Sequence, residues 1–266
     1  MAYVRSPVSS DKQQILAFCQ DTFSWGDYIH EVYDFWTHEG VLAILDQDGT
    51  PIGMGHGVTY PEEEMLWIEG IRVRLSHRRH GFAEKLVSHL ERNVKESGII
   101  HADMIIESEN TQSLNLAGKI GYNIKSQWNY FPVTSKKNSI AVTFDTVDFG
   151  ELKNEELRYV ESWRWIPINQ YNFEKLESQG NVLCVKNNGK IQSLGIISES
   201  ISFENTIILT IIFGTRDDIQ KMILYAQNLS AEKNYSKVRI LTEQDNLPEI
   251  DNLGKKFQFY LVEKKL

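Results

Sequence analysis

A short basic segment at residues 78–83 constrains this chain more than any other part of its sequence. The segment reads Arg-Arg-His-Gly-Phe-Ala, and it follows residues 65–74, which have the length and apolar content of a strand. Residues 82–95 come next, with apolar side chains at helical spacing: Leu86, Val87, Leu90 and Val94. The sequence therefore predicts a strand, a tight basic turn and an amphipathic helix in succession.

This turn has the chemistry of an anion site. The first turn of a helix exposes backbone N–H groups that carry partial positive charge, and Gly81 and Ala83 leave room for a phosphate to reach them. Residues of basic type surround the turn: Arg72, Arg74, His77, Arg78, Arg79 and His80. Because the whole chain has a net charge of −8, this cluster favours a specific anion site over general nucleic-acid binding. The alternative interpretation is a solvated helix start capped by Ser76.

The order of predicted elements indicates an α+β fold (mixed α/β) with one mostly antiparallel sheet and flanking helices. Around the turn, the further elements are a helix at 11–20, strands at 41–45 and 52–58, a strand at 102–106 and a helix at 110–121. The opening hairpin argues against a doubly wound parallel sheet. The length of 266 residues suits two domains of about 130 residues each. A polar stretch at 143–154 predicts that they span residues 1–145 and 150–266.

The second half of the chain repeats the first in outline. Three pairs of segments resemble each other: 41–44 and 182–185, 104–107 and 240–243, and 116–122 and 253–259. At the place of the basic turn the second half has Gly214–Ile219, which includes Asp217 and Asp218. These carboxylates repel an anion, so the sequence predicts one anion site per chain and a degenerate second domain.

Several absences guide the expected localisation. No stretch approaches the roughly 20 apolar residues needed to cross a bilayer, and residues 1–6 lack the apolar core of a signal peptide. The two cysteines, Cys19 and Cys184, are too few for a disulfide scaffold, and no spacing of histidines and cysteines suggests a metal. We expect a cytoplasmic protein without a metal that binds neither membrane nor nucleic acid, and the sequence is compatible with a homodimer.

Arg78-x-x-Gly81-x-Ala83 resembles the R/Q-x-x-G-x-G/A motif of the GNAT superfamily of acetyl-CoA-dependent N-acetyltransferases. Residues 67–73 are similar to the central strand of that family, and residues 110–113 and 119–122 to its next helix. The resemblance implies a catalytic GNAT domain followed by a degenerate GNAT-like domain, with acetyl-CoA as co-substrate. The implied cofactor-binding residues are Ile71, Arg72, Val73, Arg78, Arg79, His80, Gly81, Phe82, Ala83, Asn110 and Ser113. In particular, the N–H groups of the turn would hold the pyrophosphate, and the strand would pair with the pantetheine arm.

Acetyl transfer to an amine needs a base, a donor to the oxyanion and an acid for the leaving thiolate. Glu69 is the candidate base, because it lies on the central strand in an apolar setting; the alternative is a strand carboxylate paired with an arginine. The resemblance implies the Val73 N–H as oxyanion donor. Ala117 stands where many members of the family have the acidic tyrosine, so Tyr130 is the candidate acid, with Tyr28, Ser113 or water as alternatives.

The aromatic segment at residues 23–36 falls where such folds bind the acceptor, and we expect Trp25 and Tyr28, with Glu69, to contact it. The alternative is ordinary helix packing. His56 is equally compatible with the core and with the site. The sequence thus predicts acetyl transfer to a primary amine of a small molecule or peptide. The alternatives are a non-catalytic acetyl-CoA-binding or interaction module and, less well matched to the appended half, a protein N-terminal acetyltransferase.

Overall fold

The chain forms two compact units that are interleaved in sequence. The computed structural model describes residues 1–20, 22, 27–138, 142–152, 156–200, 206–251, 253–254 and 256–266. The first unit comprises Met1–Ile105, Asn110–Ile124 and Val262–Leu266, and the second comprises Ile106–Glu109 and Lys125–Leu261. The last five residues therefore return to the first unit. The domain limits of 145 and 150 stay a prediction.

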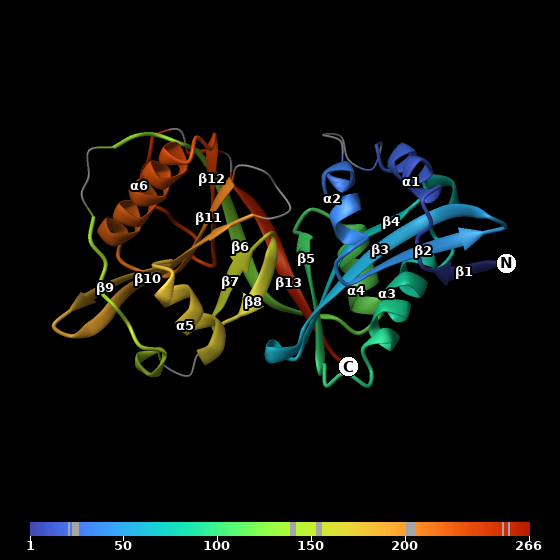
Figure 1. Cartoon of the computed structure of the whole chain (residues 1–266), viewed down its shortest axis with the longest axis horizontal. Helices are drawn as coiled ribbons and strands as arrows, with labels where there is room; N and C mark the ends of the chain where they lie inside the picture. The colour runs from blue at the N-terminus through green and yellow to red at the C-terminus, as the bar shows by residue number, and fades with distance from the viewer. Residues whose placement is uncertain are drawn as a thin grey trace. The chain divides into compact units, whose positions relative to one another are not determined.

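A sheet with helices on both faces forms the first unit (Figure 1). Its strands, in spatial order, are β1 (Ala2–Arg5), β2 (Val41–Gln47), β3 (Thr50–Tyr60), β4 (Met65–Val73) and β5 (His101–Glu107), and the C-terminal part of β13 (Phe257–Lys265) lies next to β5. Its helices are α1 (Asp11–Cys19), α2 (Ile29–Trp36), α3 (Phe82–Asn93) and α4 (Thr111–Lys119). The pairs β1–β2, β2–β3 and β3–β4 are antiparallel, whereas β4 and β5 are parallel. The α+β class with a mostly antiparallel sheet is confirmed.

The two faces of this sheet carry different helices because side chains alternate along β3. Met54 packs with the buried residues of α1 and α2, among them Ile15 and Trp36. On the opposite face, the side chains of Leu86 and Leu90 from α3 lie over the glycines of β3; a Cβ added to Gly57 would lie 3.3 Å from Leu90. The even-numbered residues Met54 and His56 of β3 therefore face α1 and α2. Their partners on β4, Arg72 and Glu69, face the same side.

The second unit repeats much of this order. Its strands are β6 (Asn123–Thr134), β7 (Arg158–Glu161), β8 (Arg164–Pro167), β9 (Val182–Asn187), β10 (Lys190–Glu199), β11 (Thr206–Phe213), β12 (Lys237–Thr242) and the first part of β13, and its helices are α5 (Gln170–Ser178) and α6 (Arg216–Glu232). In space the order is β13-β6-β12-β11-β10-β9, with β7 and β8 as a separate hairpin. The succession β9-β10-β11-α6-β12 matches β2-β3-β4-α3-β5, so the first two repeated segments are correct. The third is wrong: residues 116–119 end helix α4, whereas residues 257–259 begin strand β13.

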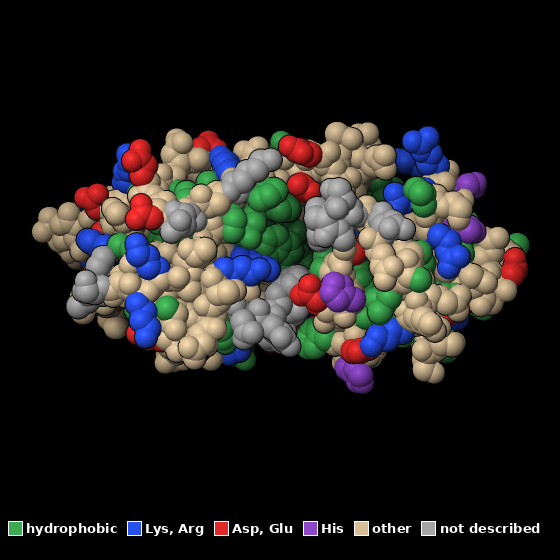
Figure 2. Space-filling view, turned by 90° about the horizontal axis from the view of Figure 1, so that it is seen from above, with side chains coloured by type: hydrophobic (Ala, Val, Ile, Leu, Met, Phe, Trp, Pro, Cys, Tyr) green, Lys and Arg blue, Asp and Glu red, His purple; other side chains and the backbone are tan. Residues whose placement is uncertain are grey.

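Two further findings bear on the expected localisation and partners. In the described part of the chain, no helix is both long and apolar enough to span a membrane. On the face seen in Figure 2, basic and acidic side chains are interspersed among the residues that are coloured by type. Among the residues coloured by type, that face shows no extended surface of one sign.

Candidate active site

The basic turn lies between β4 and α3, as the sequence predicts (Figure 1). Gly81 precedes α3 with φ at +77°, a left-handed conformation that favours glycine. A Cβ added there would meet nothing within 4 Å. The first helical hydrogen bond runs from the Lys85 N–H to the Gly81 carbonyl (3.0 Å), and no side chain caps the helix. The N–H groups of residues 79–84 donate to no described residue, so they remain available to an anion.

Side chains of the turn fasten it to the end of β4. Arg78 Nε donates to the Val73 carbonyl at 3.1 Å, and His80 Nδ1 lies 2.8 Å from the Arg78 carbonyl. Arg79, His80 and Gly81 are exposed, whereas Phe82 and Ala83 are half-buried. The predicted phosphate-binding residues are thus gathered in one accessible turn beside the end of the central strand.

Strands β4 and β5 separate well before β4 ends. Their register runs only from Met65–Trp67 on β4 to His101–Asp103 on β5, although β4 continues to Val73. The Arg74 N–H donates to Ile52 on β3 (2.8 Å). Because N–H groups alternate between the two edges of a strand, the Val73 N–H points to the β5 side, where the ladder has ended. The pairing of the two central strands with each other therefore does not extend over Ile68–Val73.

Glu69 pairs with His56. Its Oε1 lies 2.9 Å from His56 Nδ1, and its Oε2 accepts a hydrogen bond from Trp67 Nε1 at 3.2 Å. The Glu69 side chain is 12% exposed and that of His56 is fully buried. Trp36 of α2 stacks on the imidazole, with ring centroids 4.6 Å apart. A left-handed bulge at Gly70 (φ +65°) makes room for the same indole, since a Cβ there would lie 2.4 Å from Trp36.

The hydrogen bonds of His56 determine how many protons the His56–Glu69 pair holds. His56 Nε2 lies 2.7 Å from the Glu39 carbonyl, and a carbonyl only accepts, so Nε2 carries a hydrogen. The contact between His56 Nδ1 and Glu69 therefore needs one further proton, held by either partner. The pair is an imidazolium with a carboxylate or a neutral imidazole with a carboxylic acid.

A second buried pair lies beside the first. Arg72 donates to both carboxylate oxygens of Asp27, from Nε at 2.7 Å and from a terminal nitrogen at 3.1 Å. The guanidinium also lies over the ring of Tyr28, 5.4 Å from its centroid, and Tyr28 meets Trp36 edge to face at 6.2 Å. Burial raises the pKa of Tyr28 to about 12, so its phenol stays protonated at neutral pH and can act as a donor.

The other predicted site residues have mixed surroundings. Asn110 caps α4, where its Oδ1 accepts from the Ser113 N–H at 3.1 Å. Tyr130 belongs to the second unit, and its ring lies 5.4 Å from that of Trp163. Burial raises the pKa of Tyr130. Trp25 lies outside the described residues.

Sequence reasoning missed the roles of Asp27 and Trp36 and left His56 undecided. These residues come from α2, from the loop before it and from β3. They reach the central strand through separate contacts: Asp27 with Arg72, Trp36 with Gly70, and His56 with Glu69. No local spacing signals this contact. The one sequence clue is a histidine among the glycines of residues 53–57.

Comparison with known proteins gives a family match for the first unit. Residues 13–122 match the model of the acetyltransferase (GNAT) family. Among solved structures, a candidate acetyltransferase from Thermoplasma acidophilum is 14% identical, with all of both chains covered and a TM-score of 0.67. A GCN5-related N-acetyltransferase from Sphaerobacter thermophilus is 13% identical over 99% of this chain and 95% of that one, with a TM-score of 0.63. Curated proteins give no match.

A third structure bears on the two-unit layout. It is a tandem GNAT protein from the clavulanic acid biosynthesis pathway, 10% identical over all of this chain and 98% of its own, with a TM-score of 0.56. The family match over residues 13–122 supports an acyltransferase. More particularly, residues 13–122 are a GNAT acetyltransferase domain, within a chain whose whole fold is that of tandem GNAT proteins.

Proposed function

We propose that this chain transfers the acetyl group of acetyl-CoA to a primary amine of a small molecule or peptide. The observation that carries the proposal is the open start of α3 beside the point where β4 and β5 separate. A pyrophosphate fits the free N–H groups of residues 79–83, because they combine main-chain donors with the positive end of the helix. The Ile71–Val73 edge then offers backbone partners to an amide-containing arm, and Asn110 and Ser113 lie at the start of the next helix.

The His56–Glu69 pair supplies the base in this proposal. Once it has lost the shared proton, it accepts a proton from the ammonium of the acceptor, directly or through water. The neutral amine attacks the thioester carbon, and the Val73 N–H donates to the oxygen that becomes negative. The carbon–sulfur bond then breaks, and the CoA thiolate takes up a proton as it leaves.

Tyr28 and Tyr130 are the two candidate acids for the thiolate. Tyr28 lies in the unit of Glu69, it is linked to the His56 stack through Trp36, and its raised pKa keeps the proton available. Tyr130 has a raised pKa as well, but its ring contacts lie in the second unit. A fall in kcat for Tyr28→Phe with an unchanged KM for acetyl-CoA would select Tyr28, and the same result for Tyr130→Phe would select Tyr130.

The test is a thiol-release assay with acetyl-CoA over a panel of free amino acids, polyamines, aminoglycosides and peptide N-termini. For the acceptor with the highest activity, Glu69→Gln should lower kcat by about 100-fold, in the range of general-base catalysis. Its affinity for acetyl-CoA should not change. The matched control is Glu64→Gln, which alters an exposed carboxylate just before the same strand. An unchanged pH–rate profile in Glu69→Gln would remove the pair from the base role.

A non-catalytic acetyl-CoA-binding module is the second candidate. Ala117 favours it, because this buried residue replaces a proton donor that the family often has. Calorimetric binding of acetyl-CoA without thiol release from any acceptor would support the module and contradict the transferase.

A further inference from the structure

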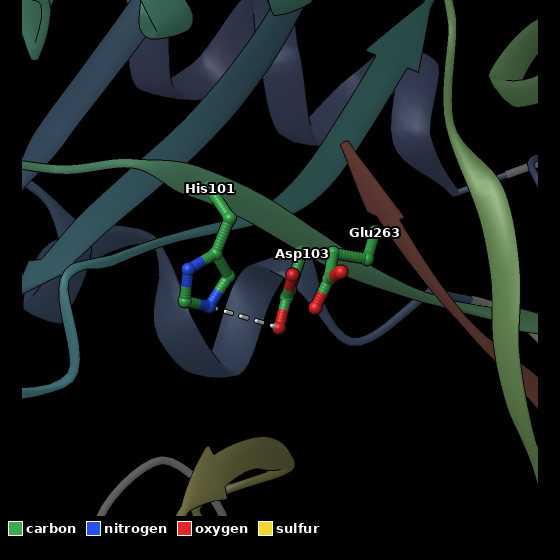
Figure 3. Close-up of side chains that lie close together, drawn as sticks. All are labelled: His101, Asp103 and Glu263. Atoms are coloured by element: carbon green, nitrogen blue, oxygen red, sulfur yellow. Dashed lines mark ion pairs between the residues drawn. The ribbon is translucent and has the colours of Figure 1, made fainter. Parts of the chain in front are cut away.

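Three potential metal ligands converge on one face of the first unit's sheet. His101 and Asp103 are two residues apart on β5, so their side chains share a face. Glu263 comes from the C-terminal part of β13, the strand next to β5. One ligand atom from each residue lies within 4.8 Å of the other two. In Figure 3 the imidazole and the two carboxylates point toward one another from neighbouring strands.

The strand register explains why the two carboxylates meet. The Leu266 N–H donates to the Ile100 carbonyl at 2.9 Å, and the Ser108 N–H donates to the Gln258 carbonyl at 2.9 Å. Both bonds belong to one antiparallel register, in which Glu263 lies directly opposite Asp103. Like charges in opposite positions repel each other. The Asp103 side chain is fully buried, where water does little to weaken that repulsion, so the arrangement favours a cation between the carboxylates.

His101 supplies a separate observation. Its Nε2 is buried and makes no hydrogen bond within the described part of the chain. A buried nitrogen without a hydrogen bond lowers the stability of the folded state. Nε2 lies 3.8 Å from Asp103 Oδ2, which is too far for a hydrogen bond. This separation is close to the roughly 3.4 Å between two ligand atoms of a tetrahedral ion with bonds of about 2.1 Å.

We propose that His101, Asp103 and Glu263 bind a divalent transition-metal ion, with Zn²⁺ as the best fit. Imidazole nitrogen combined with carboxylate oxygen suits Zn²⁺ and its neighbours in the first transition row. Mg²⁺ fits less well, because it prefers oxygen ligands only. Glu263 is half-exposed, so its side chain can complete the set by a small rotation, whereas Asp103 is held in the core.

The location defines a structural role for this ion. Glu263 lies in the Val262–Leu266 segment, which returns to the first unit at the end of the chain. An ion held by β5 and β13 fastens that segment to the sheet, and its binding free energy adds to the stability of the folded unit. Asp103 is also the register partner of Trp67, whose indole donates to Glu69. The ion thereby supports the strand that presents the candidate base.

The experiment uses the full chain, treated with a chelator and titrated with Co²⁺. Visible absorption follows binding, and displacement by Zn²⁺ gives the Zn²⁺ affinity. We expect one site per chain, with Glu263→Gln and His101→Gln each weakening both ions at least tenfold. The matched control is Glu31→Gln: His30 and Glu31 form an exposed pair 3.9 Å apart, and this change should leave affinity unaltered.

Thermal unfolding distinguishes a variant that has lost one metal-binding side chain from a variant whose fold is damaged. Zn²⁺ should raise the melting temperature of the natural chain and of Glu31→Gln, but not that of Glu263→Gln. Absence of saturable Co²⁺ binding, or equal affinity in all four proteins, would overturn the proposal.

Discussion

The two units start their equivalent helices in opposite ways. In the first, α3 begins after Gly81, no side chain caps it, and the space beside the glycine is open. In the second, Thr215 caps α6 by accepting from the Asp218 N–H. Asp218 in turn accepts from Thr215 Oγ1 at 2.9 Å and from Ser193 Oγ at 2.8 Å. The first helix start has no capping side chain, whereas at the second the Thr215 and Asp218 N–H groups donate to side chains of the protein.

The strands before these helices differ in the same sense. Between β4 and β5 the parallel register covers three residue pairs and ends at Trp67. Between β11 and β12 it covers six pairs, from Thr206 to Ile211. A Cβ on Gly214 would lie 3.0 Å from Ser193, whereas one on Gly81 would meet nothing. The same order of elements thus leaves one helix start open and closes the other through a few residues, and we propose that only the open one binds the cofactor.

The largest expected effect comes from placing a carboxylate in the open turn. Gly81→Asp should lower acetyl-CoA affinity at least 100-fold, about 2.7 kcal/mol, because it puts a negative charge where phosphate would bind. Gly81→Asn has nearly the same size and the same left-handed strain, so it is the matched control. Calorimetry should show a much smaller loss for Asn than for Asp. Equal losses would mean that strain, and not charge, controls the turn.

The sequence alone predicts the features that are formed by residues close together in the chain. The turn at residues 78–83, the flanking strand and helix, and its acidic counterpart at Gly214 each depend on neighbours within a few positions. Short-range patterns therefore identify them, and the structure places each between the expected elements. The boundaries differ by one or two residues, as at the end of α3, where side-chain packing rather than pattern decides.

Contacts between segments that are far apart in the chain could not be predicted from the sequence. His56 and Glu69 meet through an antiparallel register with a shift between Met54 and His56, which no spacing reveals. Likewise, Glu263 reaches Asp103 only because β13 returns to β5 after the whole second unit. The sequence therefore suggested no metal site, since metal motifs are found by ligands that are close in the chain.

A smaller effect is expected when the closed turn is opened. Asp218→Asn should destabilise the protein by about 1–3 kcal/mol, because the buried charge loses strong hydrogen bonds. Burial opposes ionisation of Asp218, but bonds from Ser193, Thr215 and Lys221 outweigh it and hold the pKa below its ordinary value of 3.8. A depressed pKa adds stability above the unfolded value, and this is lost as pH falls through the folded one. Urea unfolding should therefore show the full difference at pH 7 and a shrinking one below about pH 4.

Acetyl-CoA affinity is the control for this variant. Because the comparison assigns no cofactor to the second unit, calorimetry should give the same affinity for Asp218→Asn as for the natural chain. A tenfold loss would show that the closed turn also contributes to cofactor binding, and the distinction between the two units would fail.

The smallest expected effect concerns the separated strands. The Val73 N–H points to the open side of β4, so its hydrogen exchange should slow severalfold when acetyl-CoA binds and supplies a partner. Ile207 to Ile211 lie in a β11 ladder that is already paired with β12, and their exchange should not change. Exchange measured by mass spectrometry on peptides from both strands makes the comparison within one sample. Slowing in β11 to the same degree would indicate general stabilisation of the fold, because a ligand on the β4 edge alone protects only the strand that it contacts.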